Sequence, residues 1–85
     1  MPTVLVYRAY RIVVYLNDHG PAHVHAVGPD GNARFSLGDG PGEVRLMDVD
    51  GIGKRDLRGI AAAIIDRHDQ CLEAWRSIHG NQDPD

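Results

Sequence analysis

The stretch Ala22–Leu37, AHVHAVGPDGNARFSL, decides the fold of this 85-residue chain. The residues 22–27 and 32–37 on either side of its centre are predicted to form strands. Between them, Gly28-Pro29-Asp30-Gly31 is a strong turn signal because glycine and proline favour tight turns. The stretch therefore predicts a β-hairpin.

Working outward, we expect two strands before this hairpin and one after it. Val4–Tyr7 and Arg11–Leu16 are rich in β-branched and aromatic residues, and only three residues separate them. Residues 43–47 are expected to add a fifth, shorter strand after the glycine-rich loop 38–42. The first half of the chain thus predicts an antiparallel sheet of four to five strands.

The second half predicts one long helix over about residues 54–79, with Gly80 as its stop signal. Helical spacing places one apolar stripe on it, made of Leu57, Ile60, Ala61, Ile64, Ile65, Leu72, Trp75 and Ile78. We therefore expect an α+β fold in which this helix packs on one face of the sheet. Residues 1–80 should form a single domain, and residues 81–85 a disordered tail.

Composition limits the classes of function. The net charge of −3 includes no lysine or arginine run, so a broad basic surface for nucleic acid is not predicted. No apolar run approaches the roughly 18 residues of a membrane span, and the amino terminus does not resemble a signal peptide. We expect a cytoplasmic protein. Because Cys71 is the only cysteine, an internal disulfide is excluded. We expect Cys71 to be a small buried residue.

The candidates for chemistry are three of the five histidines, which lie within seven positions. His23 and His25 share one face of their predicted strand because alternate residues point the same way. In the preferred register, the alternate small residues of the strand lie under the helix and both imidazoles face away from it. His19 on the preceding turn could fold over the same patch, and Asp18 could orient one imidazole through its ring N–H.

His68 is a separate case, because the helical wheel places it in the middle of the apolar stripe. A histidine in this position is usually a core residue with a satisfied hydrogen bond. In the opposite sheet register, His23 and His25 would face the helix and His68 could join them as a third imidazole.

Three chemistries fit these residues. In the first, His19, His23 and His25, with Asp18 or with His68, bind zinc or another divalent metal. The second needs no cofactor: the histidine pair cleaves RNA by acid–base catalysis, supported by Arg11, Arg34 or Arg45. In the third, the histidines only form a hydrogen-bond network or a surface for a partner.

The chain also resembles a known family of small bacterial proteins, domain of unknown function 4160. The resemblance covers about residues 1–79, and its most specific part is His19-x-Pro21-x-His23-x-His25. The spacing of His68 and Trp75, seven residues apart, also matches the family. Members commonly have Pro-Pro before the second histidine, whereas Ala22 replaces the second proline here.

The resemblance implies one half of a two-gene module, whose usual neighbour is an antitoxin-like family, domain of unknown function 2442. Our first hypothesis is therefore a toxin–antitoxin-like component, a metal-independent ribonuclease using His23 and His25 with His19 and Asp18. Its partners would be a small antitoxin-like protein and RNA. The alternative is a non-enzymatic module that binds a metal or a protein. A homodimer is also expected, because a single helix leaves one sheet face bare.

Overall fold

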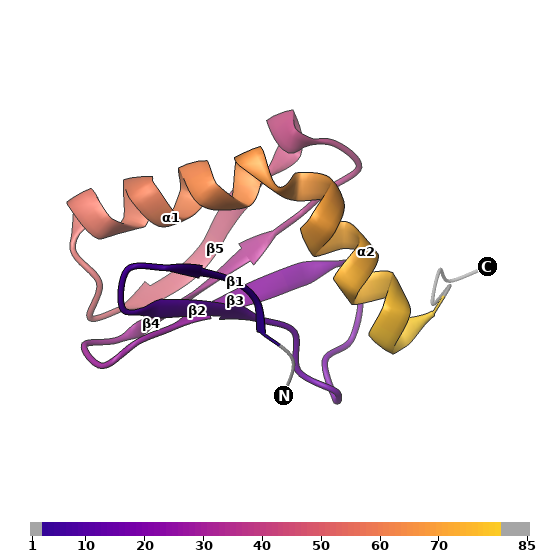
Figure 1. Ribbon diagram of the computed structural model, residues 1–85, viewed down its shortest axis with the longest axis horizontal. Helices are drawn as coiled ribbons and strands as arrows, with labels where there is room; N and C mark the ends of the chain where they lie inside the picture. Colours follow the sequence, from indigo (N-terminus) through magenta and orange to yellow (C-terminus); the bar gives the residue numbers. More distant parts are fainter. Residues whose placement is uncertain (1–2, 81–85) are drawn as a thin grey trace.

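A computed structural model describes residues 3–80 of the protein. These residues form an α+β fold (Figure 1). Its elements are β1 (Thr3–Tyr7), β2 (Tyr10–Val13), β3 (His23–Val27), β4 (Asn32–Ser36), the short 3-10 helix η1 (Pro41–Glu43), β5 (Arg45–Asp50), α1 (Lys54–Asp66) and α2 (His68–His79). The five strands form one antiparallel sheet in chain order. The predicted fold class and strand number are confirmed, although the fifth strand lies at 45–50 rather than 43–47.

The predicted hairpin is formed by β3 and β4. Their turn is closed by a hydrogen bond from the Gly28 N–H to the Gly31 carbonyl oxygen, 3.0 Å long. His25 of β3 lies opposite Arg34 of β4 and opposite Val13 of β2. Since paired residues of antiparallel strands share a face, these three side chains form one row across the sheet.

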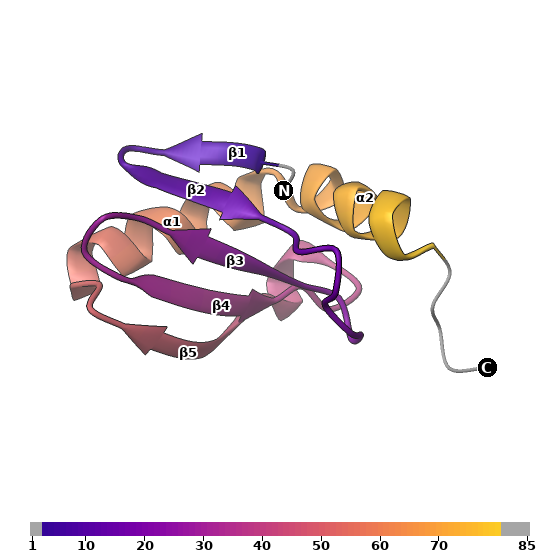
Figure 2. The same ribbon diagram turned by 90° about the horizontal axis from the view of Figure 1, so that it is seen from below.

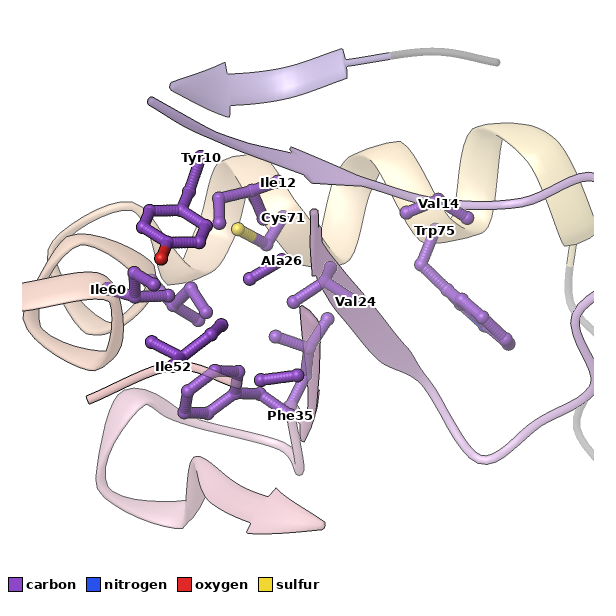
Figure 3. Close-up of a cluster of buried hydrophobic side chains, with 13 residues drawn as sticks. Tyr10, Ile12, Val14, Val24, Ala26, Phe35, Ile52, Ile60, Cys71 and Trp75 are labelled. Carbon is purple, nitrogen blue, oxygen red and sulfur yellow. The ribbon is translucent and has the colours of Figure 1, made fainter. Parts of the chain in front are cut away.

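The other face of the sheet carries the hydrophobic core (Figure 3). Val24 and Ala26 of β3 are fully buried there, together with Ile12 of β2 and Ile60 and Ile64 of α1. Burying each of the larger side chains contributes about 1.5–3 kcal/mol. The preferred register is therefore confirmed for α1: the small residues of β3 face α1, and His23 and His25 lie on the other face of the strand. The expectation that both imidazoles face away from the helical half is wrong for His23, whose ring packs against Trp75 of α2.

The single long helix predicted over residues 54–79 is wrong. Arg67, with φ −114° and ψ 32°, leaves the helical region and separates α1 from α2. A straight helix over these residues would be about 39 Å long, well over twice the length of a five-residue strand. The bend lets α2 turn toward the end of the sheet where β2 finishes and β3 begins (Figures 1 and 2). Ile65, predicted on the buried stripe, is exposed because α1 buries Ile60 and Ile64 instead.

Gly59 allows α1 to approach the first hairpin closely. A Cβ at this position would overlap the Tyr7 hydroxyl group and ring. Glycine in a helix interior costs about 1 kcal/mol of stability relative to alanine. The close contact with Tyr7 explains why glycine occupies this position despite that cost.

At the carboxyl-terminal end, Gly80 has φ 63° and ends α2, as the sequence predicted. The predicted tail, residues 81–85, lies outside the described residues. Among residues 3–80, no helix combines the length and apolar character that crossing a membrane requires.

Candidate functional site

Asp18, His23 and His25 come together at the end of the sheet that α2 approaches. Asp18 lies in the connection between β2 and β3, and the two histidines occupy the first and third positions of β3. One potential ligand atom from each of the three residues lies within 4.8 Å of the other two. We call these three residues the Asp–His cluster.

A tight turn holds the carboxylate of Asp18 in place. The Asp18 N–H donates to the Tyr15 carbonyl oxygen at 3.2 Å. In return, the Tyr15 N–H donates to Asp18 Oδ2 at 3.1 Å. This reciprocal pair is typical of aspartate in turns, where the short side chain satisfies a nearby backbone group. The carboxylate is therefore positioned by backbone before either histidine contacts it.

Both imidazoles direct Nε2 at this carboxylate. His25 Nε2 lies 3.1 Å from Oδ1 and 3.1 Å from Oδ2, and His23 Nε2 lies 3.5 Å from Oδ1. The side chains of His23, His25 and Asp18 are 8%, 20% and 12% exposed. The cluster is thus largely shielded from water, with His25 as its most accessible member.

The other nitrogen of His23 determines how this ring is protonated. Nδ1 lies 3.0 Å from the Pro21 carbonyl oxygen. Because a carbonyl oxygen only accepts hydrogen bonds, Nδ1 carries a proton and donates it. In the neutral ring, Nε2 then bears a lone pair directed toward Asp18 Oδ1, which is itself an acceptor. A cation between two acceptors that face each other would be stabilised by both of them.

Aromatic rings enclose the cluster on the side of α2. The ring of His23 lies between those of His25 and Trp75, with centroid separations of 5.1 and 5.0 Å. Trp75 also packs against His79 at 4.2 Å, and His79 Nε2 lies 3.1 Å from the Tyr15 carbonyl oxygen. Because α2 and the β2–β3 connection are joined through these contacts, the rotamers of the cluster are held by packing on both sides.

The electrostatics favour an ionised Asp18. Burial acts to raise the pKa of this carboxyl, but other interactions outweigh it and lower the pKa below its ordinary value. These interactions are the hydrogen bonds from the Tyr15 N–H and from His25, and the positive charge of His25 and His23 when protonated. Asp18 is therefore a negatively charged carboxylate that can interact with a cation.

The structure does not bring His19 into the cluster. Its side chain is exposed, and it is not among the residues of the described chain whose ligand atoms converge. It lies next to Asp18 in the same connection, but the turn that directs Asp18 inward leaves His19 outward. The predicted set of three histidines is therefore replaced by two histidines and one carboxylate.

His68 lies apart from the pair and has a structural role. It is buried at the start of α2, and its Nε2 lies 2.8 Å from the Leu37 carbonyl oxygen just after β4. This hydrogen bond ties the helix bend to the sheet. It agrees with the expectation of a core histidine that makes a hydrogen bond, although the other ring nitrogen, Nδ1, is buried without a hydrogen-bond partner in the described chain. The alternative in which His68 joins His23 and His25 is not realised.

The three arginines proposed to support catalysis are engaged elsewhere or exposed. Arg34, the cross-strand neighbour of His25, pairs with Asp48 at 2.7 Å. Arg45 donates to the carbonyl oxygens of Gly42 and Val44, and Arg11 is exposed on β2. None of these contacts directs a guanidinium group at the Asp–His cluster.

Sequence reasoning missed His79 and underestimated Trp75 as parts of the site. Trp75 was expected only in the core, where it is indeed buried, yet its ring also contacts His23. A signal was present, because residues four apart share a helix face and His79 follows Trp75 at that spacing. Cys71 is buried as predicted, and burial raises the pKa of its thiol to about 11, which argues against a reactive thiol.

The fold and the site define a small α+β protein with a partly buried aspartate–histidine cluster at one end of its sheet. The chain belongs to the family described as Domain of unknown function (DUF4160), whose model matches residues 9–76. The resemblance inferred from the sequence is thus confirmed, and the matched range contains the whole Asp–His cluster and Trp75. A search of curated proteins found no match, and neither did a search of solved structures.

Proposed function

We propose that this protein binds a divalent transition-metal ion through Asp18, His23 and His25. Two imidazole nitrogens and a carboxylate oxygen form a donor set that suits zinc and similar ions. Ligands about 2.1 Å from a tetrahedral zinc ion lie roughly 3.4 Å from one another. The nitrogen–oxygen distances of 3.1 and 3.5 Å in the cluster are close to this separation.

The observation that carries the proposal is the hydrogen bond from His23 Nδ1 to the Pro21 carbonyl oxygen. It fixes Nε2 as the nitrogen with the lone pair, and Nε2 points into the cluster. Metal-binding histidines commonly donate their second ring N–H to a backbone carbonyl group in this way. The Tyr15 N–H supports Asp18 similarly, so two of the three ligands are held by the backbone.

Three protein ligands leave at least one coordination position for another molecule. Zinc sites of this composition commonly bind water there, whereas structural sites are filled by four protein ligands. Because His25 is the most exposed member of the cluster, we expect such a position beside its imidazole. The arrangement thus suits a site that activates water or binds an oxygen-containing ligand.

Metal-independent cleavage of RNA by the histidine pair is supported less well. In that mechanism each imidazole must present a nitrogen to the substrate. His23 is buried, with Nδ1 directed at Pro21 and Nε2 at Asp18. The ribonuclease activity and the toxin–antitoxin role both remain predictions, to be tested by RNA cleavage and by co-purification with a partner.

Metal titration of the purified protein, stripped with a chelator, tests the proposal. Zn²⁺ binding is measured by calorimetry in buffers of different ionisation enthalpy, which reports the protons released from the ligands. Ni²⁺ or Co²⁺ binding is followed by fluorescence quenching, because Trp75 is the only tryptophan and its ring lies 5.0 Å from that of His23.

The variants Asp18→Asn, His23→Ala and His25→Ala should each weaken binding by more than about a hundredfold, since loss of an outer-shell partner alone costs 10–100-fold. His19→Ala is the matched control: it removes an exposed imidazole from the same connection and should leave affinity unchanged. One stoichiometric ion bound by the native protein and lost in the three variants is the expected result. Native binding that survives in all three variants, or no binding at all, would rule out this site.

A further inference from the structure

β5 is an edge strand: one side of it pairs with β4, and its other side pairs with no strand of the described chain. Its apolar side chains are exposed. All six residues of β5, Arg45–Asp50, are exposed. Leu46, Met47 and Val49 are 45%, 45% and 41% exposed. Figure 2 shows β5 at the end of the strand order, with β4 on one side and no element of the described chain on the other. Such an edge presents free backbone N–H and C=O groups to another strand.

The opposite edge strand of the sheet, β1, is contacted by a side chain of α2. There, Gln70 of α2 reaches over β1 and donates from its side-chain amide to the Val4 carbonyl oxygen at 2.9 Å. A helix side chain thus occupies a backbone acceptor of β1. Covering an edge in this way is one means by which proteins prevent unwanted strand pairing. Pairing is therefore favoured at β5 rather than at β1.

We propose that β5 pairs in antiparallel fashion with β5 of a second copy of this chain, which joins two sheets edge to edge. The strand reads Arg45-Leu46-Met47-Asp48-Val49-Asp50, and its two outer positions at each end are complementary to their own reverse. With the two-fold axis between residues 47 and 48, Arg45 lies opposite Asp50 of the second copy, and Leu46 lies opposite its Val49. The two-fold axis repeats each pair, which gives two ion pairs and two apolar pairs on either side of two central Met47–Asp48 pairs.

The irregularity of β5 makes this alignment consistent with the faces of the sheet. Leu46 pairs with Phe35 and Val49 with Ala33 of β4, so both lie on the face that carries the core. Residues three apart share a face here because the register of β4 and β5 shifts between Arg34 and Phe35.

Arg45 and Asp50 both lie on the opposite face, since they pair with Ser36 and Asn32 of β4. In the proposed alignment the charged residues therefore meet on one face and the apolar residues on the other. Opposite charges directly across an antiparallel pair are favourable, and like charges are unfavourable.

The extent of the edge predicts a weak dimer. A six-residue strand is about 20 Å long, and pairing along it buries less than the roughly 800 Å² per partner of a standard interface. Association should therefore rise with protein concentration rather than be complete at low concentration. The interface does not include the Asp–His cluster, so metal binding and dimerisation can fail independently.

Sedimentation equilibrium over a wide range of concentration, with charge-reversed variants, tests the proposal. Arg45→Asp places aspartate opposite aspartate in the homodimer, and Asp50→Arg places arginine opposite arginine. Each variant alone should associate about tenfold more weakly than the native chain, or not at all. An equimolar mixture should form a heterodimer, because every charged pair is then opposite in sign.

Val6→Glu on β1 is the matched control and should associate like the native chain, since it alters an exposed valine of the other edge strand. Circular dichroism confirms that each variant is folded. A native chain that stays monomeric at all concentrations would overturn the proposal and leave the edge to a strand of another protein. Single variants that dimerise normally, or a mixture that does not associate, would overturn it as well.

Discussion

Replacing Asp18 with asparagine should destabilise the metal-free protein. Asparagine has the same shape, and its carbonyl oxygen can still accept the hydrogen bond from the Tyr15 N–H. It removes the negative charge that His25 Nε2 approaches to 3.1 Å. Because the side chain of Asp18 is only 12% exposed, water replaces little of this interaction.

The size of the effect follows from the loss of a charge-assisted hydrogen bond. Hydrogen bonds to charged groups contribute about 1.5–3 kcal/mol, and we expect Asp18→Asn to lower the free energy of unfolding by this amount. For a domain of this size, each kcal/mol shifts the melting temperature by about 4–8 °C. The variant should therefore melt roughly 6–24 °C below the native protein.

The effect should also depend on pH in a defined direction. Burial acts to raise the pKa of Asp18, but the hydrogen bonds and the histidine charges lower it below the ordinary value of 3.8. A carboxyl group with a depressed pKa in the folded state contributes stability that is complete above its unfolded pKa. That contribution is lost as the pH falls through the folded pKa. The difference between native and variant should be complete near neutral pH and should shrink below pH 3.8.

Urea unfolding, followed by the fluorescence of Trp75 in the presence of a chelator, measures this difference at neutral and acidic pH. Asp48→Asn is the control, because Asp48 forms an exposed ion pair with Arg34, and such pairs contribute about 0–1 kcal/mol. The reasoning is refuted if Asp18→Asn costs no more than Asp48→Asn at neutral pH. It is also refuted if the loss is undiminished at the lowest pH.

Two further predictions concern the packing that supports the site. Gly59→Ala should destabilise the protein despite alanine's better helix propensity, because overpacking against Tyr7 costs about 1–3 kcal/mol. In a Tyr7→Ala background the overlap is absent, and the same change should stabilise the protein by up to about 1 kcal/mol. A double-mutant cycle by urea unfolding that shows no coupling between the two positions would contradict this account. His68→Leu should cost about 1–3 kcal/mol, because it leaves the Leu37 carbonyl group without its partner. Asp69→Asn, at the exposed next residue, should change the melting temperature little, and equal effects of the two variants would show that the buried hydrogen bond is unimportant.

Local patterns in the sequence were sufficient for much of the sheet. Turn residues and β-branched runs placed the β3–β4 hairpin, and the two-residue period placed His23 and His25 on one face. The small size of the alternate residues indicated which face would lie under a helix. These predictions succeed because strand periodicity and turn chemistry depend on neighbours in the chain.

The helical half was predicted less accurately. No proline or glycine marks the bend, so the 3.6-residue period alone predicted a continuous helix. The bend occurs at Arg67, where His68 can reach the Leu37 carbonyl oxygen from the other layer of the fold. A contact between residues 31 positions apart leaves no local signal in the sequence.

By itself, the sequence determined the class of fold and the pairing of His23 with His25 on one strand face. Tertiary structure decided which groups complete the site: Asp18 turns inward, His19 stays outside, and Trp75 and His79 enclose the cluster. The physical reason is that the β2–β3 connection has no periodicity of its own. Its conformation is set by the hydrogen bonds of Tyr15 with Asp18 and His79, and one of these comes from a helix 64 residues further along the chain.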